Sequence, residues 1–299
     1  MILGTDISRW QGNVNFGKMK QAGATFVAMR CTVGDYYTDP TFVENWEKAQ
    51  DAGLYVTPYF VVAPATSSGI VLSAKNHVDR LLKELGDRKE DFPLIMDCEL
   101  SRGRSRDQIR KLYTDIIRLL QEKQYGPKWF PIIYTRALWW KANVSDDGWW
   151  RNGICPLHVA RYSDTLTGPW SDGSCLIPGW TMWDFWQWSA DGNGRGAEFG
   201  VESASIDLNW FNGDLTTFQR RFGLEVTGEP EPDPELPDTV VIKVGWMGLN
   251  ARTSPDASNY VNRIAKLYNG VPVTVLDKVG QWYKVRLEQD LWIHENYTK

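Results

Sequence analysis

Short apolar runs and stretches with helical spacing alternate along the first 225 residues of the chain. Seven runs rich in apolar, β-branched and aromatic residues predict strands: 1–6, 24–31, 54–62, 92–100, 130–135, 155–162 and 181–188. Three stretches between them predict helices: 39–53, about 70–85, and 105–123 with Ser105 as its N-cap. Repeated strand–helix units predict a β/α barrel, and its second half should be irregular because long helical patterns end before residue 130.

A segment rich in proline and acidic residues interrupts this pattern at 226–239. Prolines recur there at Pro230, Pro232, Pro234 and Pro237, and proline can neither continue a helix nor pair within a central strand. Like charges between the prolines favour an extended linker. After it, 240–299 carries short alternating runs separated by turn residues, which predicts a small all-β domain behind a larger domain at 1–225.

Composition and charge narrow the class of protein. The chain has 299 residues, 42% hydrophobic and 23% charged, which is typical of a globular protein with a large and a small domain. Its net charge of −4 disfavours nucleic acid as a partner. No apolar run approaches the roughly 20 residues that span a bilayer, so no membrane insertion is expected. The N-terminus lacks the basic and apolar regions of a signal peptide, which predicts synthesis in the cytoplasm or a leader already removed.

Cysteine and histidine are scarce. The four cysteines are few for this length, and we expect them to be reduced, partly buried thiols: Cys31, Cys98, Cys155 and Cys175. None of their spacings to the three histidines resembles a zinc site. The sequence therefore predicts neither a metal ion nor a cofactor.

Tryptophan is unusually common and unevenly placed. Eleven of the 16 tryptophans fall between Trp129 and Trp210, more than the core of about eighty residues needs. Flat indole faces also stack on the apolar faces of sugar rings. We therefore expect some of these side chains to line a glycan-binding groove.

Carboxylates stand at several expected strand ends. Asp97 and Glu99 close the apolar run "PLIM", and residues two apart on a strand point to the same face, about 6.5–7 Å apart at Cα. Asp6 ends the first run, and Asp207 follows "SASI". In a β/α barrel such ends converge on one rim, where clustered negative charge is unfavourable unless it serves chemistry. Cleavage of a glycosidic bond fits best, because it needs carboxylates and no metal.

These residues lie in segments that resemble a known family. The chain is similar to glycoside hydrolase family 25, the Chalaropsis-type lysozymes, over nearly all of 1–215. The motifs that carry the resemblance are "GTDISRWQG", "PLIMDCEL", "IIYT", "HVARY", "FWQW" and "SIDLNWFNG". The resemblance implies a flattened, irregular β/α barrel and β-1,4-N-acetylmuramidase activity on bacterial peptidoglycan. It also implies a bacterial autolysin or, given the missing signal peptide, a phage endolysin that acts on the cell wall.

The resemblance implies roles for individual residues. Glu99 would be the general acid, and Asp97 would orient or deprotonate the amide N–H of the substrate's 2-acetamido group. Asp6 and Asp207 would raise the proton affinity of Glu99 and bind water or sugar. Further residues on matching motifs would contact sugar: Gln11, Arg30, Tyr59, Tyr134, Tyr162 and Gln187.

Two segments depart from the family pattern. The family usually has K-A-T-E-G where this chain has Arg30-Cys31-Thr32-Val33-Gly34, so the positive charge is kept and the acid is lost. An aromatic-His pair is replaced by Tyr59-Phe60. These differences bear on the fine substrate preference and leave the Asp97/Glu99 pair intact.

The C-terminal part resembles a second kind of domain, and two other functions are compatible with the large domain. Residues 248–297 are similar to bacterial SH3-like domains, which implies binding to the cell wall; a packing domain without a ligand is the alternative. A chitinase-like or glucosaminidase barrel would favour a longer D-x-x-D-x-D-x-E signature, whose upstream acids are missing before Asp97. A non-catalytic glycan-binding protein is the other rival. The sequence predicts no oligomeric state.

Overall fold

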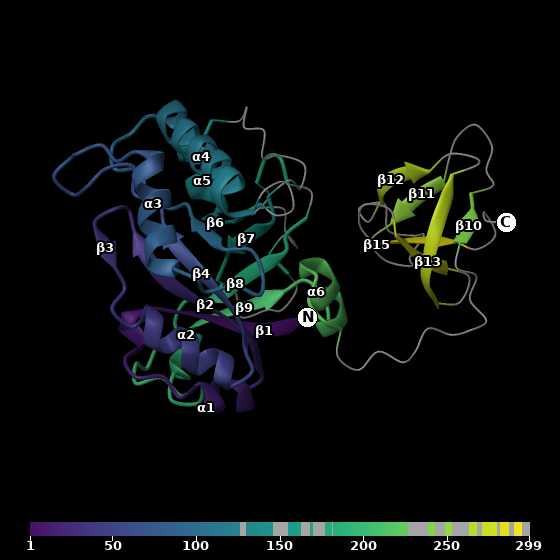
Figure 1. Cartoon of the computed structure of the whole chain (residues 1–299), viewed down its shortest axis with the longest axis horizontal. Helices are drawn as coiled ribbons and strands as arrows, with labels where there is room; N and C mark the ends of the chain where they lie inside the picture. The colour runs from purple at the N-terminus through teal and green to yellow at the C-terminus, as the bar shows by residue number, and fades with distance from the viewer. Residues whose placement is uncertain are drawn as a thin grey trace. The chain divides into compact units, whose positions relative to one another are not determined.

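The computed structural model divides the chain into two compact units, Met1–Leu224 and Glu225–Lys299 (Figure 1). It describes residues 1–125, 130–145, 155–162, 168–169, 177–180, 182–226, 239–242, 249–252, 263–267, 271–279, 282–286 and 290–294. The predicted linker at 226–239 lies outside these residues except at its two ends.

The first unit is a closed barrel. Its sheet has the order β1-β9-β8-β7-β6-β5-β4-β2-β3, and an additional β1–β2 pairing closes the ring with β3 outside it. The strands are β1 Ile2–Ile7, β2 Ala24–Val33, β3 Tyr37–Thr38, β4 Tyr55–Val61, β5 Ile95–Asp97, β6 Ile132–Arg136, β7 Leu157–Ala160, β8 Phe185–Ser189 and β9 Asp207–Phe211. Neighbouring strands of the ring run parallel, except that β9 is antiparallel to both β8 and β1. The predicted β/α barrel is confirmed.

Helices pack around this barrel (Figure 1). They are α1 Phe16–Gln21, α2 Phe42–Asp51, α3 Ala74–Leu85, α4 Arg106–Leu120, α5 Ala137–Asn143 and α6 Leu215–Phe222. Ser105 caps α4 as predicted: its hydroxyl accepts the Gln108 N–H, and the Gln108 side chain accepts the Ser105 N–H. Beyond residue 130, the described α-helices are the short α5 and α6, so the predicted irregular second half is also observed.

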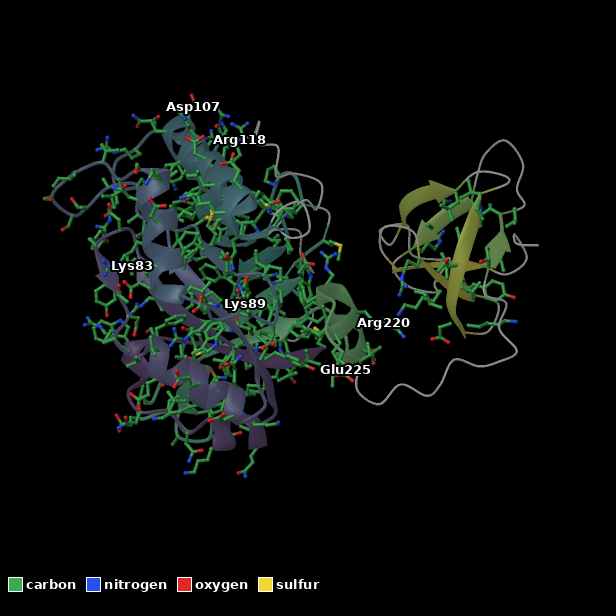
Figure 2. All side chains as sticks on the ribbon, in the orientation of Figure 1. Lys83, Lys89, Asp107, Arg118, Arg220 and Glu225 are labelled. Atoms are coloured by element: carbon green, nitrogen blue, oxygen red, sulfur yellow. The ribbon has the colours of Figure 1, made fainter. Side chains whose placement is uncertain are left out.

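The apolar core has two layers. Along α4, Ile109 and Ile116 are buried towards the sheet, whereas Asp107 and Arg118 lie on the outer side (Figure 2). A second layer fills the interior of the barrel with rings from β2, β8, β9, α6 and the approach to β5: Phe26, Phe185, Phe211, Phe218, Phe222 and Phe92. Their centroids lie 5.0–6.5 Å apart, a distance typical of packed aromatic pairs. These rings fill one end of the barrel interior, and polar side chains line the other end.

The second unit is an antiparallel sheet with the order β10-β13-β14-β15-β11-β12. Its strands are β10 Thr239–Val241, β11 Leu249–Arg252, β12 Arg263–Leu267, β13 Pro272–Val279, β14 Trp282–Arg286 and β15 Asp290–His294. Val240, Ala251, Val273 and Val285 belong to its small buried core. The predicted all-β character of 240–299 is confirmed for the described residues.

Candidate active site

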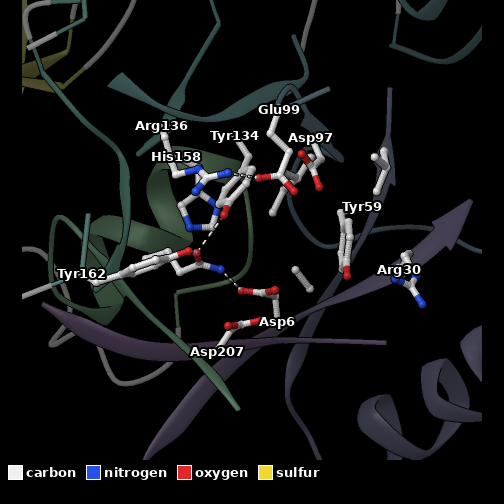
Figure 3. Close-up of a pocket in the computed structure, with 14 residues that line it drawn as sticks. Asp6, Arg30, Tyr59, Asp97, Glu99, Tyr134, Arg136, His158, Tyr162 and Asp207 are labelled. Carbon is white, nitrogen blue, oxygen red and sulfur yellow. Dashed lines mark hydrogen bonds and ion pairs between the residues drawn. The ribbon is translucent and has the colours of Figure 1, made fainter. Parts of the chain in front are cut away.

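A pocket of about 280 Å³ opens at the rim where the parallel strands end (Figure 3). Every strand of the closed ring contributes at least one side chain to the wall of the pocket. The lining residues are Asp6, Ala28, Arg30, Tyr59, Val61, Ile95, Asp97, Glu99, Tyr134, Arg136, His158, Tyr162, Gln187 and Asp207. Nine of the ten residues expected at a site thus lie around one cavity, and Gln11 is the exception.

Asp97 and Glu99 reach the pocket because the chain stays extended beyond the end of β5. The Asp97 carbonyl accepts the Val62 N–H at 2.9 Å, and the Cys98 N–H donates to the Tyr134 carbonyl at 2.9 Å. Cys98 is fully buried in the core on the opposite face. The alternation expected from the sequence therefore places both carboxylates on the pocket side.

Burial makes this pair unusually basic. Desolvation raises the pKa of Asp97 well above its ordinary value, and the charges of Glu99 and Asp6 raise it further. Desolvation also raises the pKa of Glu99, against the opposing effect of Arg136, whose Nη2 lies 3.4 Å from Glu99 Oε2. The side chain of Glu99 is 31% exposed, so it is the member of the pair that a ligand can reach. An acid in this setting can hold a proton at a pH where ordinary carboxyls have lost theirs.

A second acid pair lies across the pocket, where Figure 3 shows Asp6 beside Asp207. Asp207 does not follow a strand, as the sequence suggested, because it begins β9. It still reaches the same rim, since an antiparallel strand begins where its parallel neighbours end, and Asp6 and Asp207 are register partners. Burial, the charge of Asp6 and a hydrogen bond with it raise the pKa of Asp207 to about 9. Asp207 thus keeps its proton at neutral pH and donates it in the hydrogen bond to Asp6.

A chain of polar side chains holds Asp6 in place. Its Oδ2 accepts hydrogen bonds from Gln187 Nε2 and Asn209 Nδ2, both at 2.9 Å. The Tyr134 hydroxyl donates to Gln187 Oε1 at 2.8 Å, and the Tyr162 hydroxyl donates to the same oxygen at 3.3 Å. These bonds fix the orientation of the acid and of two of the tyrosines that wall the pocket.

The sequence interpretation missed His158, Asn209 and Arg136. His158 Nε2 donates to Asn209 Oδ1 at 2.8 Å, because the amide nitrogen of Asn209 is engaged with Asp6. Burial lowers the pKa of His158 to about 4, so the imidazole is neutral. Arg136 lies two residues after Tyr134 at the end of β6. The same two-residue rule that linked Asp97 to Glu99 would have identified it.

Gln11 lies away from the pocket and stabilises a turn. It belongs to the 3-10 helix Arg9–Gln11, and its Oε1 accepts the Ser8 N–H at 2.8 Å and the Ser8 hydroxyl at 3.3 Å. Arg30 does line the pocket, but its Nε and Nη2 are each 2.8 Å from Oδ2 of the buried Asp39. Arg30 is therefore a fixed part of the wall, next to Tyr59.

The expectation that tryptophans between Trp129 and Trp210 line the sugar-binding groove is wrong for those of them that the structure describes. None of them lines the pocket, and Trp140, Trp180 and Trp186 are buried in the core. The rings of Trp140 and Trp180 pack edge to face at 5.3 Å. Trp129, Trp149, Trp150 and Trp170 lie outside the described residues. Tyrosines, which combine an apolar ring with a hydroxyl, take the place expected for indoles.

Other predictions concern cysteines, metals and membranes. Cys31, Cys98 and Cys155 are free and buried, and Cys175 lies outside the described residues. Among the described residues, no group of three or more His, Cys, Asp or Glu side chains is placed to hold a metal ion. No helix in the described parts of the chain is long and apolar enough to cross a membrane.

Known proteins share this architecture. The chain is similar to lysozyme M1 of Streptomyces globisporus, with 29% identity over 222 residues that cover 71% of this chain and 68% of that protein. It is similar to an N,O-diacetylmuramidase of Chalaropsis sp, with 26% identity over 219 residues, 69% of this chain and 96% of that protein. The solved structure of a family GH25 lysozyme from Aspergillus fumigatus superimposes with a TM-score of 0.60 and 27% identity, covering 74% of this chain and 98% of that one.

Family models match both units. Residues 248–299 match the bacterial SH3 domain. Residues 5–197, which hold all but one of the pocket acids, match glycosyl hydrolases family 25. The chain therefore belongs to glycosyl hydrolases family 25 and is a glycoside hydrolase with a C-terminal bacterial SH3 domain.

Proposed function

We propose that the protein is an N-acetylmuramidase that cleaves the β-1,4 bond between N-acetylmuramic acid and N-acetylglucosamine in bacterial peptidoglycan. The observation that carries the proposal is the pair of the buried Asp97 and the half-buried Glu99 on one side of a strand end, inside a pocket walled by tyrosines. Family membership supports glycosidic cleavage. The lysozyme and diacetylmuramidase among the relatives support the wall glycan as substrate.

Glu99 acts as the general acid. Its pKa is raised by burial, and its side chain is still accessible from the pocket. A carboxyl that keeps its proton near the working pH can donate it to the leaving glycosidic oxygen, and such transfer typically contributes about 10²–10⁴ in rate. In the second step the resulting carboxylate takes a proton from the water that completes hydrolysis.

Asp97 binds the acetamido group of the sugar that is cleaved. Its Oδ1 is buried and has no hydrogen-bond partner among the described residues. A buried carboxylate oxygen without a partner is unfavourable, and an amide N–H that enters the pocket would satisfy it. This contact turns the acetamido oxygen towards the anomeric carbon, so that the substrate supplies its own nucleophile.

The opposite wall positions the sugar. Asp6 and Asp207, which are hydrogen-bonded to each other, present carboxyl oxygens that can accept hydrogen bonds from sugar hydroxyls across the pocket from Asp97 and Glu99 (Figure 3). Tyr59, Tyr134 and Tyr162 present ring faces and hydroxyls of the kind that hold amphipathic sugar rings. The negative charge of Asp6 also raises the pKa of Glu99, which helps that acid to keep its proton.

The two units divide the work. We assign catalysis to 1–225, a linker to 226–239 and wall binding to 240–299, where the bacterial SH3 match falls. A second binding module raises the effective concentration of the barrel at the wall without changing its chemistry. We also propose that the protein is a phage or prophage endolysin.

Replacement of the general acid tests the function. Glu99→Gln is nearly isosteric but cannot give up a proton, so clearing of a suspension of purified cell walls should slow at least about a hundredfold. Glu198→Gln removes an exposed glutamate outside the pocket and serves as the matched control. A folded Glu99→Gln variant with more than about a tenth of normal activity contradicts the assignment. If the wild type clears no walls and releases no wall fragments, the substrate assignment is wrong.

A further inference from the structure

Trp10 stands exposed on a rigid turn beside the active-site rim. The 3-10 helix Arg9–Gln11 follows β1 and is closed by the reciprocal Ser8–Gln11 cap. The Gln11 carbonyl also accepts the Glu202 N–H at 3.0 Å, which ties the turn to the loop before β9. Trp10 nevertheless leaves 66% of its surface in solvent, more than any other described aromatic residue. The fixed turn therefore presents a large, flat aromatic face on which a ligand ring can pack.

A stack of cations and rings connects Trp10 to the pocket. The guanidinium carbon of Arg9 lies 4.4 Å from the centroid of the Trp10 ring and 5.4 Å from that of Tyr37. The guanidinium carbon of Arg30 lies 5.6 Å from the same Tyr37 ring. Arg30 lines the pocket, so the stack runs from the pocket wall outwards to Trp10. A glycan strand that leaves the pocket on this side meets the stack next.

The charge of Arg9 is available to a ligand. Asp39 is the nearby acid, but its Oδ2 is taken by Arg30 and by the backbone N–H of Arg9, and its Oδ1 accepts from the Thr41 N–H and hydroxyl. Asp39 therefore neutralises Arg30 and fixes the backbone of the turn. The Arg9 guanidinium has no ion-pair partner among the described residues. Stacking on Trp10 holds its plane in place and leaves its N–H groups free to bind a carboxylate.

We propose that Trp10 and Arg9 form a distal subsite for a carboxylate-bearing sugar, namely a muramyl residue of the strand whose other end lies in the pocket. The indole covers the apolar face of the ring, and the guanidinium binds a carboxylate. That carboxylate belongs either to the lactyl ether of the sugar or to the stem peptide attached to it. The inference rests on the proposed function, since it assumes that peptidoglycan enters the pocket. It also gives Gln11 a role: its cap positions Trp10, and it does not contact sugar itself.

Strand length separates this subsite from the catalytic one. The substrates are a peptide-free tetrasaccharide and a peptide-free octasaccharide of alternating N-acetylglucosamine and N-acetylmuramic acid. We expect the longer strand to occupy the pocket and the distal subsite together, and the shorter one to occupy the pocket alone. For Trp10→Ala, the ratio of KM on the octasaccharide to KM on the tetrasaccharide should rise about tenfold, since truncating a tryptophan anchor typically has such an effect.

Three arginine variants test the charge. Arg9→Gln should raise the same KM ratio several-fold and weaken its dependence on salt, whereas Arg9→Lys should retain part of the wild-type preference. Arg195→Gln is the matched control, because Arg195 also lies over an aromatic ring, Phe199 at 5.3 Å, but does not line the pocket. A peptide-bearing octasaccharide identifies the source of the carboxylate. An Arg9→Gln effect already present on the peptide-free strand indicates the lactyl group, and one confined to the peptide-bearing strand indicates the stem peptide.

A binding measurement makes the test independent of turnover. Calorimetric titration of the peptide-free octasaccharide into Glu99→Gln and into Glu99→Gln/Trp10→Ala should show about tenfold weaker binding for the double variant. Equal affinities, together with a Trp10→Ala KM ratio no different from that of Arg195→Gln, overturn the subsite. Failure of the wild type to cleave either strand would instead contradict the proposed function.

Discussion

Arg136 is the pocket cation that acts directly on the proposed general acid, so removing its charge gives a defined perturbation. Its Nη2 lies 3.4 Å from Glu99 Oε2, and the two side chains are 51% and 31% exposed. Arg136 lowers the pKa of Glu99 while burial raises it. In Arg136→Gln the opposing effect disappears, and Glu99 should hold its proton to a higher pH.

The size of the change follows from the geometry. For charges at this separation, a water-like dielectric gives about 1.2 kcal/mol, which corresponds to about 0.9 in pKa. The water-like limit applies because half of the arginine surface is solvated, and partly exposed pairs are strongly screened. We therefore expect the pKa of Glu99 to rise by about 1 in the variant.

The assay is the pH dependence of kcat/KM on a soluble glycan fragment. An enzyme that needs a protonated Glu99 loses activity as pH rises through its pKa, so the alkaline limb should move upwards by about one pH unit in Arg136→Gln. The observed value belongs to a coupled set of groups. The ionisable groups that face Glu99 in the pocket are Asp6, Arg30, Tyr59, Asp97, Tyr134, Arg136, His158, Tyr162 and Asp207. The limb position does not depend on how much activity the variant loses in absolute terms.

Two controls separate charge from shape. Arg136→Lys keeps the positive charge and should leave the alkaline limb close to that of the wild type. Arg195→Gln removes a cation paired with Glu198 outside the pocket and should leave the limb where it is. A folded Arg136→Gln enzyme whose alkaline limb stays fixed or moves to lower pH refutes the assignment of Glu99 as the acid.

Three further predictions concern stability, organisation and stereochemistry. The pKa of Asp207 is about 9 in the fold against an ordinary 3.8, so its contribution to stability is full below the ordinary value and is lost as pH rises through the folded value. The melting temperature should fall between pH 5 and pH 8 and fall less in Asp207→Asn; equal slopes would contradict the raised pKa of Asp207. A chain ending at Glu225 should fold alone, cleave soluble fragments and bind whole walls less well than the full chain in a sedimentation assay, whereas equal wall binding would contradict the role of 240–299. Proton NMR in the first minutes of cleavage should show the β-anomer, because an acetamido nucleophile inverts the centre and water inverts it again. An initial α-anomer would instead indicate water activated by Asp6 or Asp207 across the pocket.

Much of the barrel and its acid pair could be predicted because the signals are local. The period of two places Asp97 and Glu99 on one face, and the parallel strands around them bring that face to the rim. Ser105 was recognisable as a cap because the capping bond closes within three residues.

Features that depend on tertiary context were not predictable in the same way. The antiparallel direction of β9 brings Asp207 to the rim from the beginning of its strand, and no local pattern encodes that direction. The amide side chain of Gln11 is of a kind that can bind sugar, but its oxygen accepts the hydrogen bond from the Ser8 backbone N–H. Trp140 and Trp186 resemble a sugar platform in the sequence, yet the large core between sheet and helices buries them.

The most direct test of the central claim is mass spectrometry of borohydride-reduced products released from purified peptidoglycan. Cleavage after N-acetylmuramic acid leaves that sugar at the new reducing end, so reduction should convert it to the muramitol form in every fragment. The same products should be absent from a digest with Glu99→Gln. Fragments that end in reduced N-acetylglucosamine would show that the pocket cuts the other bond of the strand, and the muramidase account would be wrong.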